Sequence, residues 1–406
     1  MEQRLIENPK HAVMRLFGRA PFIFLGGNGS KKQVLVTDFE EVSFAQVASC
    51  RFYEIFTSVQ NEQVFEGGFV GLASYDDFSN VTTNYKSRLF KIKGALVFED
   101  GLVKIHGELA GAAIKILSEK YPQEIKSSQA IKLTPYKSDD DYISQFNLVK
   151  KDILNGRYYQ ANILRYFRAK APSNEQEIVD RFFKLSGYQG SIFSLHNEKV
   201  ISFSPERFIK ISPQIGEPNL RLETWPIKGT RPRGRDNDED ERLARELVQS
   251  KKDNAELHMI VDLMRNDFRR VSIPKSIKVL DKGSLQSFSS VHHLVAKISA
   301  DMSSDTRISD FFHKLFPAGS ITGAPKIEVM KAISEYEGRP RNWFMGNAFY
   351  LLPSGHFDSS VLIRTLWQKP DQTYEYAAGS GLVVKSEAND ELEEIKTKCR
   401  VVTQAI

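Results

Sequence analysis

Two carboxylates and one lysine fall on a single face of the last predicted helix, where they could hold a divalent cation. At 3.6 residues per turn, Glu391, Glu394 and Lys398 point the same way. They border an apolar stripe made of Leu392, Ile395, Cys399 and Val402. Mg²⁺ commonly takes one or two protein carboxylates and leaves its other positions to water and substrate. An exposed Glu–Lys pair explains the same spacing, and this helix alone favours that simpler interpretation.

A further acid, Glu256, lies in the apolar setting NAELHMIVDL, residues 254–263. A carboxylate among buried positions needs a partner, or it becomes protonated. A metal ion is one such partner, and Lys252 or Arg265 is another. A salt bridge within the helix is the simpler of these interpretations.

Lys228 lies in the segment WPIKGTRPRG, where Pro226 and Gly229 indicate a fixed turn. A lysine with its usual pKa near 10.4 is not a nucleophile at neutral pH. Lowering that pKa by three units takes about 4 kcal/mol of desolvation or nearby positive charge. Arg231 and Arg233 could supply such charge, although an ordinary surface lysine is the more common case.

Two small-residue segments could bring backbone close to a ligand. FPAGSITGAPK, residues 316–326, precedes a predicted helix and has Pro325 suited to its first turn. It offers N–H groups and hydroxyls to an anion but lacks the spacing of a phosphate loop, so a plain connection remains open. AGSG, residues 378–381, is the second segment. Arg364 lies in a strand-like apolar run, and a buried arginine usually pairs with a carboxylate of the protein or of a ligand.

Intermixed strands and helices must position these residues. The apolar runs within 95–106 flank Asp100-Gly101 and predict a β-hairpin. Residues 121–141 are polar and rich in breakers, which predicts a linker or a long surface loop. Regular strand–helix alternation at parallel-sheet spacing is missing, and this favours the α+β class.

Three helices are predicted around the candidate residues. Residues 139–154 place Tyr142, Phe146, Val149 and Ile153 on one face. Residues 238–267 show a long helical pattern, and a final helix begins after Ser386, which is suited to cap it.

The composition excludes several classes of protein. With 41% hydrophobic and 26% charged residues, disordered, collagen-like and coiled-coil chains are ruled out. The net charge of 56 − 51 = +5 over 406 residues suits an acidic small molecule, and we expect no nucleic-acid partner. Cys50 and Cys399 are too few for a disulfide framework or a cysteine metal site. The N-terminal residues do not resemble a secretory signal and no apolar run could span a bilayer, so we expect a cytoplasmic protein without a membrane partner.

Taken together, eight segments resemble the chorismate-utilising enzyme family and occur in that family's order. They are SFSPERF, PIKGTRPRG, KKDNAELHMIVDLMRND, VHHLV, FPAGSITGAPK, LIRT, AGSGLVV and ELEEIKTK. The resemblance runs from about Asp139 to Lys398. It implies an α+β fold in which two antiparallel sheets pack over each other with helices outside. We expect a strand-rich N-terminal portion at residues 1–130 and a catalytic core at residues 139–406, intertwined in one unit.

The resemblance also implies catalytic and metal-binding roles. Glu206 matches the general acid that protonates the departing C4 hydroxyl of chorismate, which requires a raised pKa. His293 matches the histidine near that hydroxyl. The Mg²⁺ site would consist of Glu256, Glu391 and Glu394.

The remaining implied contacts bind the substrate. Arg364, Gly379 and Gly381 match the residues that face the enolpyruvyl carboxylate. Ser320 and Lys398 match further substrate contacts. Chorismate is a dianion, so Mg²⁺, Arg364 and Lys398 would neutralise it.

Two positions distinguish members of this family. Gln160 stands where water-adding members carry a lysine base, so the chain is similar to the ammonia-using members. Lys228 stands where members that form anthranilate usually have alanine. The resemblance therefore implies amination of chorismate at C4, through a Lys228 adduct at C2, for 4-aminobenzoate and folate synthesis. Anthranilate formation is the alternative activity, and a non-catalytic relative of the same fold is the alternative class.

The chain departs from the family pattern at a few positions. Phe344 replaces the usual tyrosine, and Ser359-Ser360 replaces the usual Phe-Asn. The Leu-Leu-Glu-Ser segment linked to tryptophan binding is absent, so we expect no tryptophan feedback. Neither Cys50 nor Cys399 lies in the Gly-x-Cys-x-Gly setting of a glutamine amidotransferase. We therefore expect ammonia from a separate amidotransferase subunit or from solution, and no lyase activity.

Overall fold

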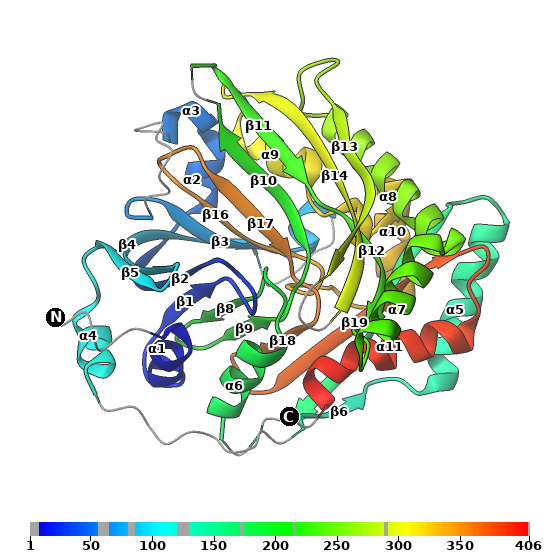
Figure 1. The fold of residues 1–406 in the computed structure, drawn as a ribbon, viewed down its shortest axis with the longest axis horizontal. Helices are drawn as coiled ribbons and strands as arrows, with labels where there is room; N and C mark the ends of the chain where they lie inside the picture. Colours follow the sequence, from blue (N-terminus) through cyan, green and yellow to red (C-terminus); the bar gives the residue numbers. More distant parts are fainter. Residues whose placement is uncertain are drawn as a thin grey trace.

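The long strand β4 (Arg88–Glu99) joins two series of strands. The computed structural model describes residues 8–55, 65–79, 86–119, 130–170, 172, 174–214, 216–287 and 291–404. Among these residues every strand pairing is antiparallel. β4 pairs with β2 in one series and with β3 in the other, and it also pairs with β5. This α+β arrangement agrees with the predicted class (Figure 1).

The first series runs from β4 to the strands that carry the AGSG segment. Its pairing order is β4, β2, β1, β8, β9, β18, β19 and β7, and β7 then pairs with both β6 and β15. The strands are β5 (Leu102–Gly107), β2 (Lys32–Val42), β1 (Phe22–Leu25), β8 (Ser191–Ser194), β9 (Lys199–Ser202), β18 (Thr365–Gln368), β19 (Tyr374–Val383), β7 (Gln160–Lys170), β6 (Lys132–Pro135) and β15 (Gly323–Ala324).

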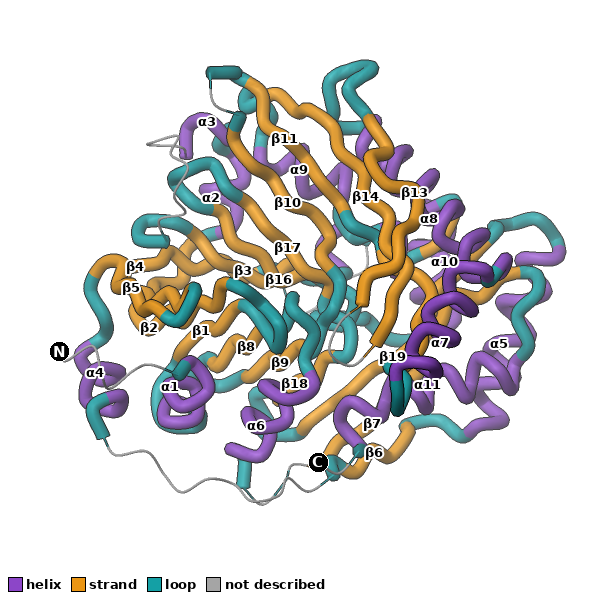
Figure 2. The backbone as a smooth tube through the Cα atoms, viewed as in Figure 1, coloured by secondary structure: helices purple, strands orange, loops and turns teal. Residues whose placement is uncertain are grey.

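The second series carries the Lys228 segment. Its pairing order is β4, β3, β16, β17, β10, β11 and β14, and β14 also pairs with β12 and β13. The strands are β3 (Phe69–Ala73), β16 (Asn347–Leu351), β17 (Phe357–Val361), β10 (Arg207–Pro213), β11 (Asn219–Thr224), β14 (Val291–Ser303), β12 (Ile227–Pro232) and β13 (Lys278–Ser287). Figure 2 shows the two series as two groups of strands.

Helices pack against both series. The α-helices are α1 (Pro9–Leu16), α2 (Phe44–Ser49), α3 (Phe52–Ile55), α4 (Gly111–Leu117), α5 (Asp139–Leu154), α6 (Gln176–Leu185), α7 (Asn237–Gln249), α8 (Lys251–Arg269), α9 (Ile308–Leu315), α10 (Lys326–Glu337) and α11 (Ala388–Thr403). Within the described ranges, the 3₁₀ helices are η2 (Asp76–Phe78) and η3 (Gly319–Ile321). α8 contacts β12, β13 and β14, and α11 contacts β19, so α8 and α11 each pack on a strand of the candidate site.

Alternating side chains of the first series fill two separate cores. In β1, Ile23 belongs to a core shared with the second series, whereas Phe22 and Phe24 belong to a core shared with α1, α4, α6 and α11. Val200 and Ile201 divide in the same way. Successive strand residues point to opposite faces, so this sheet is apolar on both sides and is covered on both.

Several local predictions are confirmed. Asp100 and Gly101, with φ of 50° and 76°, form the turn between β4 and β5. The four apolar residues predicted on one face of α5 are all buried. Ser138 caps this helix, because its hydroxyl accepts a hydrogen bond from the backbone N–H of Asp141.

Other local predictions are wrong at their boundaries. The proposed linker at residues 121–141 lies partly outside the described residues, and the remainder includes strand β6 and the start of α5. The long helix divides at Ser250, which ends α7 and whose hydroxyl accepts from the N–H of Asp253 to cap α8. Ser386 does not cap α11, because its hydroxyl accepts instead from the N–H of Val383. Pro325 precedes α10 rather than lying in its first turn.

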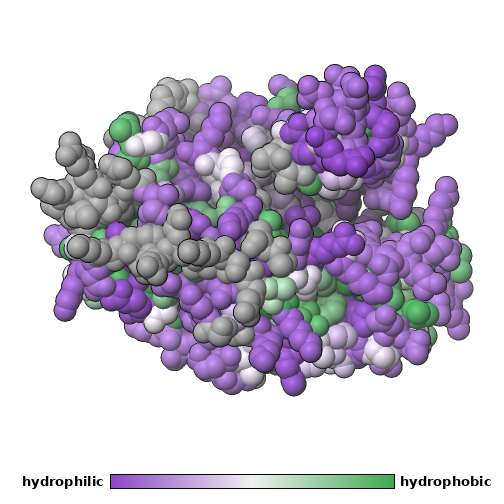
Figure 3. Space-filling model, turned by 60° about the horizontal axis from the view of Figure 1, so that its bottom comes forward, coloured by the Kyte–Doolittle hydropathy of each residue, from purple (hydrophilic) through white to green (hydrophobic). Residues whose placement is uncertain are grey.

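The face turned forward in Figure 3 is mostly hydrophilic, with small apolar areas scattered between polar side chains. Within the part of the chain that the structure describes, no helix is long and apolar enough to cross a membrane.

Candidate functional site

Glu206 lies immediately before β10, where several predicted site residues act on its carboxyl group. The hydroxyl of Ser320, in η3, donates a hydrogen bond to Glu206 Oε1 over 3.0 Å. Burial raises the pKa of Glu206, and the charges of Lys228, Lys398 and Arg364 partly oppose this rise. The structure therefore gathers four other predicted residues around the carboxyl group of Glu206, whose protonated form is favoured, as a general acid requires.

Lys228 lies on β12 beside a bulge that fixes its position. It pairs with Leu294 of β14, and the register shifts between Lys228 and Thr230. Gly229 has φ of 68°, and a Cβ there would lie 2.7 Å from Leu247 Cδ1, so the bulge requires glycine. The Lys228 charge acts on both Glu206 and Glu256. Among the described residues no carboxylate lies within ion-pair distance of Lys228, so its amine faces two acids without being paired to either.

His293 lies on β14, opposite Thr230. Its Nδ1 is 3.0 Å from Thr230 Oγ1 and 3.2 Å from Gly229 O. A carbonyl oxygen only accepts, so we place the proton on Nδ1. Burial lowers the pKa of His293 and favours the neutral ring, in which Nε2 is an acceptor. His293 is therefore suited to accept a hydrogen bond from a substrate hydroxyl, whereas Glu206 is suited to donate one.

Gly379 and Gly381 lie in β19, where groups of β7 approach the strand closely. They pair with Leu164 and Asn162 of β7, and paired residues of an antiparallel sheet share a face. A Cβ at Gly379 would lie 2.2 Å from Ile163 O. The Lys398 Nζ donates to the carbonyl oxygen of Gly379 over 2.7 Å. The close approach of the β7 backbone therefore requires glycine at position 379.

Gln160 packs against Gly381. A Cβ at Gly381 would lie 2.6 Å from Gln160 Nε2. Gln160 is 3% exposed, and its Oε1 has no hydrogen-bond partner among the described residues. Asn162 Oδ1 is also buried without a partner, a feature that the sequence did not reveal. Unsatisfied buried acceptors are rare, and here they point to a donor supplied by a ligand.

Arg364 lies between strands rather than within one, contrary to the prediction. β17 ends at Val361, β18 begins at Thr365, and Arg364 has φ of 52°. Burial lowers its pKa, while Tyr376 and Glu206 act in the opposite direction. Within the described residues no carboxylate forms an ion pair with the Arg364 guanidinium. A cation held in this way is suited to a carboxylate that arrives with a ligand.

The three predicted metal ligands lie on α8 and α11. Burial raises the pKa of Glu256, and the Glu394 charge contributes to this rise. Burial opposes the charge of Glu394 as well, but the Lys398 ammonium, 2.7 Å away, outweighs it and lowers the pKa of Glu394. Glu391 is 9% exposed. Two carboxylates that repel each other fit a divalent cation chemically, and oxygen donors suit Mg²⁺.

Glu256, Glu391 and Glu394 do not form a complete metal site by themselves. Among the described residues no group of three or more His, Cys, Asp or Glu side chains is gathered closely enough to hold a metal ion. Lys398 pairs with Glu394 on the same side of α11. As predicted, Leu392, Ile395, Cys399 and Val402 are buried beside this face.

The departures from the family pattern have structural explanations. Phe344 is 2% exposed and packs against Tyr166 and Trp367, with ring centroids 6.0 and 5.8 Å away. It therefore contributes to the core. Ser359 bridges β17 to β10, because its hydroxyl donates to Ile209 O and accepts from Ile209 N, each over 3.2 Å.

A separate cavity lies away from these residues. It has a volume of about 580 Å³ and is lined by β1, β2, β8, β10, β16 and β17, including Arg207, Trp225 and Tyr350. None of the eleven predicted site residues lines it. The candidate site is therefore defined by the side chains that converge on Glu206.

Comparisons with known proteins agree with the predicted family. The model of the chorismate binding enzyme family matches residues 31–404. Aminodeoxychorismate synthase component 1 of Salmonella typhimurium is 38% identical over 255 residues, which are 63% of this chain and 55% of the relative. Anthranilate synthase component 1 of Bacillus pumilus is 34% identical over 267 residues, 65% of this chain and 50% of the relative. The match thus spans about half the length of these relatives.

Solved structures share the fold. Anthranilate synthase component I from Streptococcus pneumoniae superposes with a TM-score of 0.75 at 23% identity, over 95% of this chain and 90% of that chain. The menaquinone-specific isochorismate synthase from Escherichia coli superposes with a TM-score of 0.72 at 17% identity, over 98% of this chain and 91% of that chain. The predicted fold is therefore confirmed.

Proposed function

The chain belongs to the chorismate binding enzyme family, and from this we propose that it acts as an aminodeoxychorismate synthase component I. It would convert chorismate and ammonia to 4-amino-4-deoxychorismate, a precursor of 4-aminobenzoate and folate. One observation carries the proposal: Lys228 faces both Glu206 and Glu256 without an ion-pair partner among the described residues. The similarity to the Salmonella relative supports it.

The proposed first step forms a covalent adduct. In the reactive form, Glu206 carries its proton and Lys228 is a neutral amine that has released a proton to solvent. The amine attacks C2, the ring double bond shifts, and the C4–O bond breaks. Glu206 gives its proton to the departing hydroxyl, which leaves as water. His293 Nε2 accepts a hydrogen bond and orients that hydroxyl.

In the proposed second step, ammonia attacks C4, the double bond shifts back, and the C2–N bond breaks. The electron pair returns to the Lys228 amine, and the product carries the new C4–N bond. Water and the aminated product are the only net products. Arg364 and Lys398 hold the substrate carboxylates, and Gly379 and Gly381 contact the enolpyruvyl carboxylate.

We further propose that the reaction requires Mg²⁺, held by Glu256, Glu391 and Glu394. When bound, the ion supplies positive charge to the ring carboxylate of chorismate. The raised pKa of Glu256 and its repulsion by Glu394 support a cation at this position. A glutamine amidotransferase subunit is the proposed ammonia source, and the cytoplasm the proposed location. In the name of the Salmonella relative, "component 1" supports a partner subunit.

Anthranilate synthesis is the rival activity, supported by the Bacillus pumilus relative. Direct attack of ammonia at C2 would produce it without a lysine adduct. Mass spectrometry distinguishes the two routes. Protein incubated with chorismate and Mg²⁺ without ammonia should gain the mass of one chorismate less one water on the peptide containing Lys228. Unmodified Lys228 during active turnover would contradict the proposed route.

A further inference from the structure

An ion pair buried next to the candidate site is not used by the proposed reaction. Lys326 Nζ lies 3.0 Å from Asp267 Oδ1, and the two side chains are 5% and 0% exposed. Lys326 is the first residue of α10, and Asp267 lies near the end of α8. Burial raises the pKa of Asp267 and lowers that of Lys326, and each charge opposes the effect of burial on the other. Their charged states therefore depend on their contact.

Lys326 also closes the loop that precedes it. Its Nζ donates to Leu315 O over 3.0 Å and to Pro317 O over 3.2 Å. The same loop lies directly on α8, because a Cβ at Gly319 would be 2.8 Å from Leu263 Cδ2 and 3.1 Å from Asp267 Oδ2. The ion pair thus fixes the first half of the loop to α8.

The second half of the loop is fixed to β7. The backbone N–H of Asn162 donates to Thr322 O over 2.8 Å. Gly323 and Ala324 form β15 and pair with Ala161 and Gln160. Both ends of the loop are therefore held, and Ser320 lies between them.

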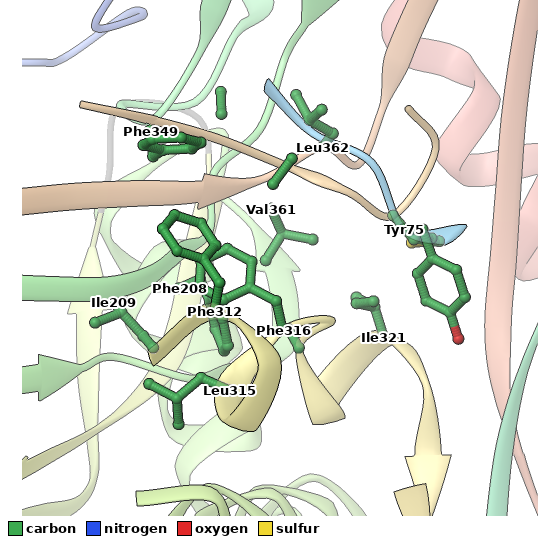
Figure 4. Packing of buried hydrophobic residues seen from close by; sticks show 14 of the residues in the cluster. Tyr75, Phe208, Ile209, Phe312, Leu315, Phe316, Ile321, Phe349, Val361 and Leu362 are labelled. Carbon is green, nitrogen blue, oxygen red and sulfur yellow. The ribbon is translucent and has the colours of Figure 1, made fainter. Parts of the chain in front are cut away.

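The loop also packs on the strand that follows Glu206. Figure 4 shows Phe316 and Ile321 of the loop together with Phe208 and Ile209 of β10. The ring centroids of Phe208 and Phe316 are 5.0 Å apart. A shift of the loop would therefore move Ser320 relative to the carboxyl group of Glu206.

We propose that Asp267 and Lys326 are positioning residues that hold the Ser320 hydroxyl against Glu206. The inference rests on the proposed role of Glu206 as the general acid. Neither residue reaches the reacting atoms. They act through the loop, because a buried charge that loses its partner is costly and the seated loop keeps the two together.

The test uses a double variant, Asp267→Leu with Lys326→Met, which removes both charges so that none is left buried and unpaired. Lys326→Met alone should destabilise the protein more, because it leaves the buried Asp267 carboxylate without its partner. Lys10→Met serves as control, because Lys10 contacts the buried Asp180 over 2.6 Å in an ion pair on α1 and α6. Circular dichroism and thermal melting verify that each variant is folded.

Steady-state kinetics with chorismate give the first readout. The folded double variant should lose about tenfold or more in kcat with little change in KM, as expected when a catalytic group is misplaced. Ser320→Ala should cause a similar loss, and adding it to the double variant should cause little more, since both changes remove one hydrogen bond. A folded double variant with wild-type kcat would overturn the inference. A loss in kcat from Ser320→Ala that multiplies in full with the loss in the double variant would also overturn the inference.

A second readout does not depend on turnover. Infrared difference spectra between each protein and its Glu206→Gln form report the protonation of this carboxyl group against pH. The Ser320 hydrogen bond favours the ionised acid, so its loss should move the midpoint to higher pH in both Ser320→Ala and the double variant. Lys228, Lys398 and Arg364, the other groups that act on Glu206, are unchanged in these variants. Equal midpoints in the wild type and the double variant would contradict the inference, even if the proposed reaction is itself wrong.

Discussion

The Ser320 hydroxyl donates a hydrogen bond to Glu206 Oε1 over 3.0 Å, although the two residues are 114 positions apart in the chain. Glu206 precedes a strand of the second series, and Ser320 lies in a 3₁₀ turn packed on α8. Two separate elements therefore determine the hydrogen bond at the Glu206 carboxyl group. Its protonation depends on burial, on this hydroxyl and on three nearby cations.

The pH dependence of activity follows from this environment. A general acid works only while protonated, and burial raises the pKa of Glu206 above its ordinary value. Activity should therefore persist to higher pH than for an exposed glutamate and fall as pH rises past the shifted pKa. In Ser320→Ala the opposing hydrogen bond is lost, so the falling limb of kcat/KM should move to still higher pH.

Profiles of kcat/KM between mildly acidic and alkaline pH check this prediction. Ser309→Ala, on the neighbouring helix α9 and outside the site, is the control and should retain the wild-type profile. A limb that moves to lower pH in Ser320→Ala would contradict the assignment of Glu206 as the acid.

Lys228→Ala tests the nucleophile. Without the amine no C2 adduct forms, so formation of the C4-aminated product should fall by at least about 100-fold, a typical contribution of covalent or acid–base groups. Lys251→Ala, at an exposed position at the start of α8, should keep full activity. Product measured by chromatography decides the outcome, and undiminished amination in Lys228→Ala would show that ammonia attacks without the lysine.

Much of this site could be predicted because its residues occur in long ordered motifs. The positions that the structure brings around Glu206 are Ser320, Lys228, Lys398 and Arg364, all named from the sequence. Local periodicity also predicted the buried stripe of α11. An ordered set of motifs predicts which residues lie together, because those residues are needed in one site.

What could not be predicted depends on contacts between distant segments. The break at Ser250 follows from a side-chain cap that apolar periodicity does not show. Ser386 prefers a backbone donor at Val383 over the helix end, because the chain turns back there before α11 begins. The unpartnered carboxamides of Gln160 and Asn162 arise from the register of β7 on β19, which no local pattern shows.

The two glycines of β19 should respond differently to alanine. At Gly379 the new Cβ would lie 2.2 Å from a backbone oxygen, which cannot move alone. Gly379→Ala should therefore lower the free energy of unfolding by about 1–3 kcal/mol, as overpacking does. Urea denaturation measures this loss, and an unchanged midpoint would contradict the close approach of β19 and β7.

At Gly381 the new Cβ would instead meet Gln160 Nε2, the end of a flexible side chain. Gly381→Ala should change the free energy of unfolding by less than about 1 kcal/mol. It should nevertheless lower the rate with ammonia, because the Gln160 side chain must move away from position 381. A large loss of stability together with full activity in Gly381→Ala would contradict this prediction.

Glu256→Gln tests the proposed metal site. The change keeps the shape of the side chain and removes a charge that burial and Glu394 already disfavour, so the fold should be retained. The Mg²⁺ concentration that gives half-maximal activity should rise by at least about tenfold. Glu393→Gln is the matched control, because Glu393 pairs with Lys396 on the exposed side of α11.

Thermal stabilisation by Mg²⁺ in the presence of chorismate provides a readout besides activity. Binding to the folded state raises the melting temperature, and tighter binding at the same ligand concentration raises it more. The wild type and Glu393→Gln should be stabilised equally, and Glu256→Gln less. Equal stabilisation of all three would remove Glu256 from the metal site.

The central claim is amination of chorismate at C4, and one assay tests it most directly. Purified protein is incubated with chorismate, ammonium and Mg²⁺, and the products are separated with and without an added aminodeoxychorismate lyase. We predict 4-aminobenzoate only after the lyase is added and no fluorescent anthranilate in either sample. Anthranilate as the main product without the lyase would contradict the account.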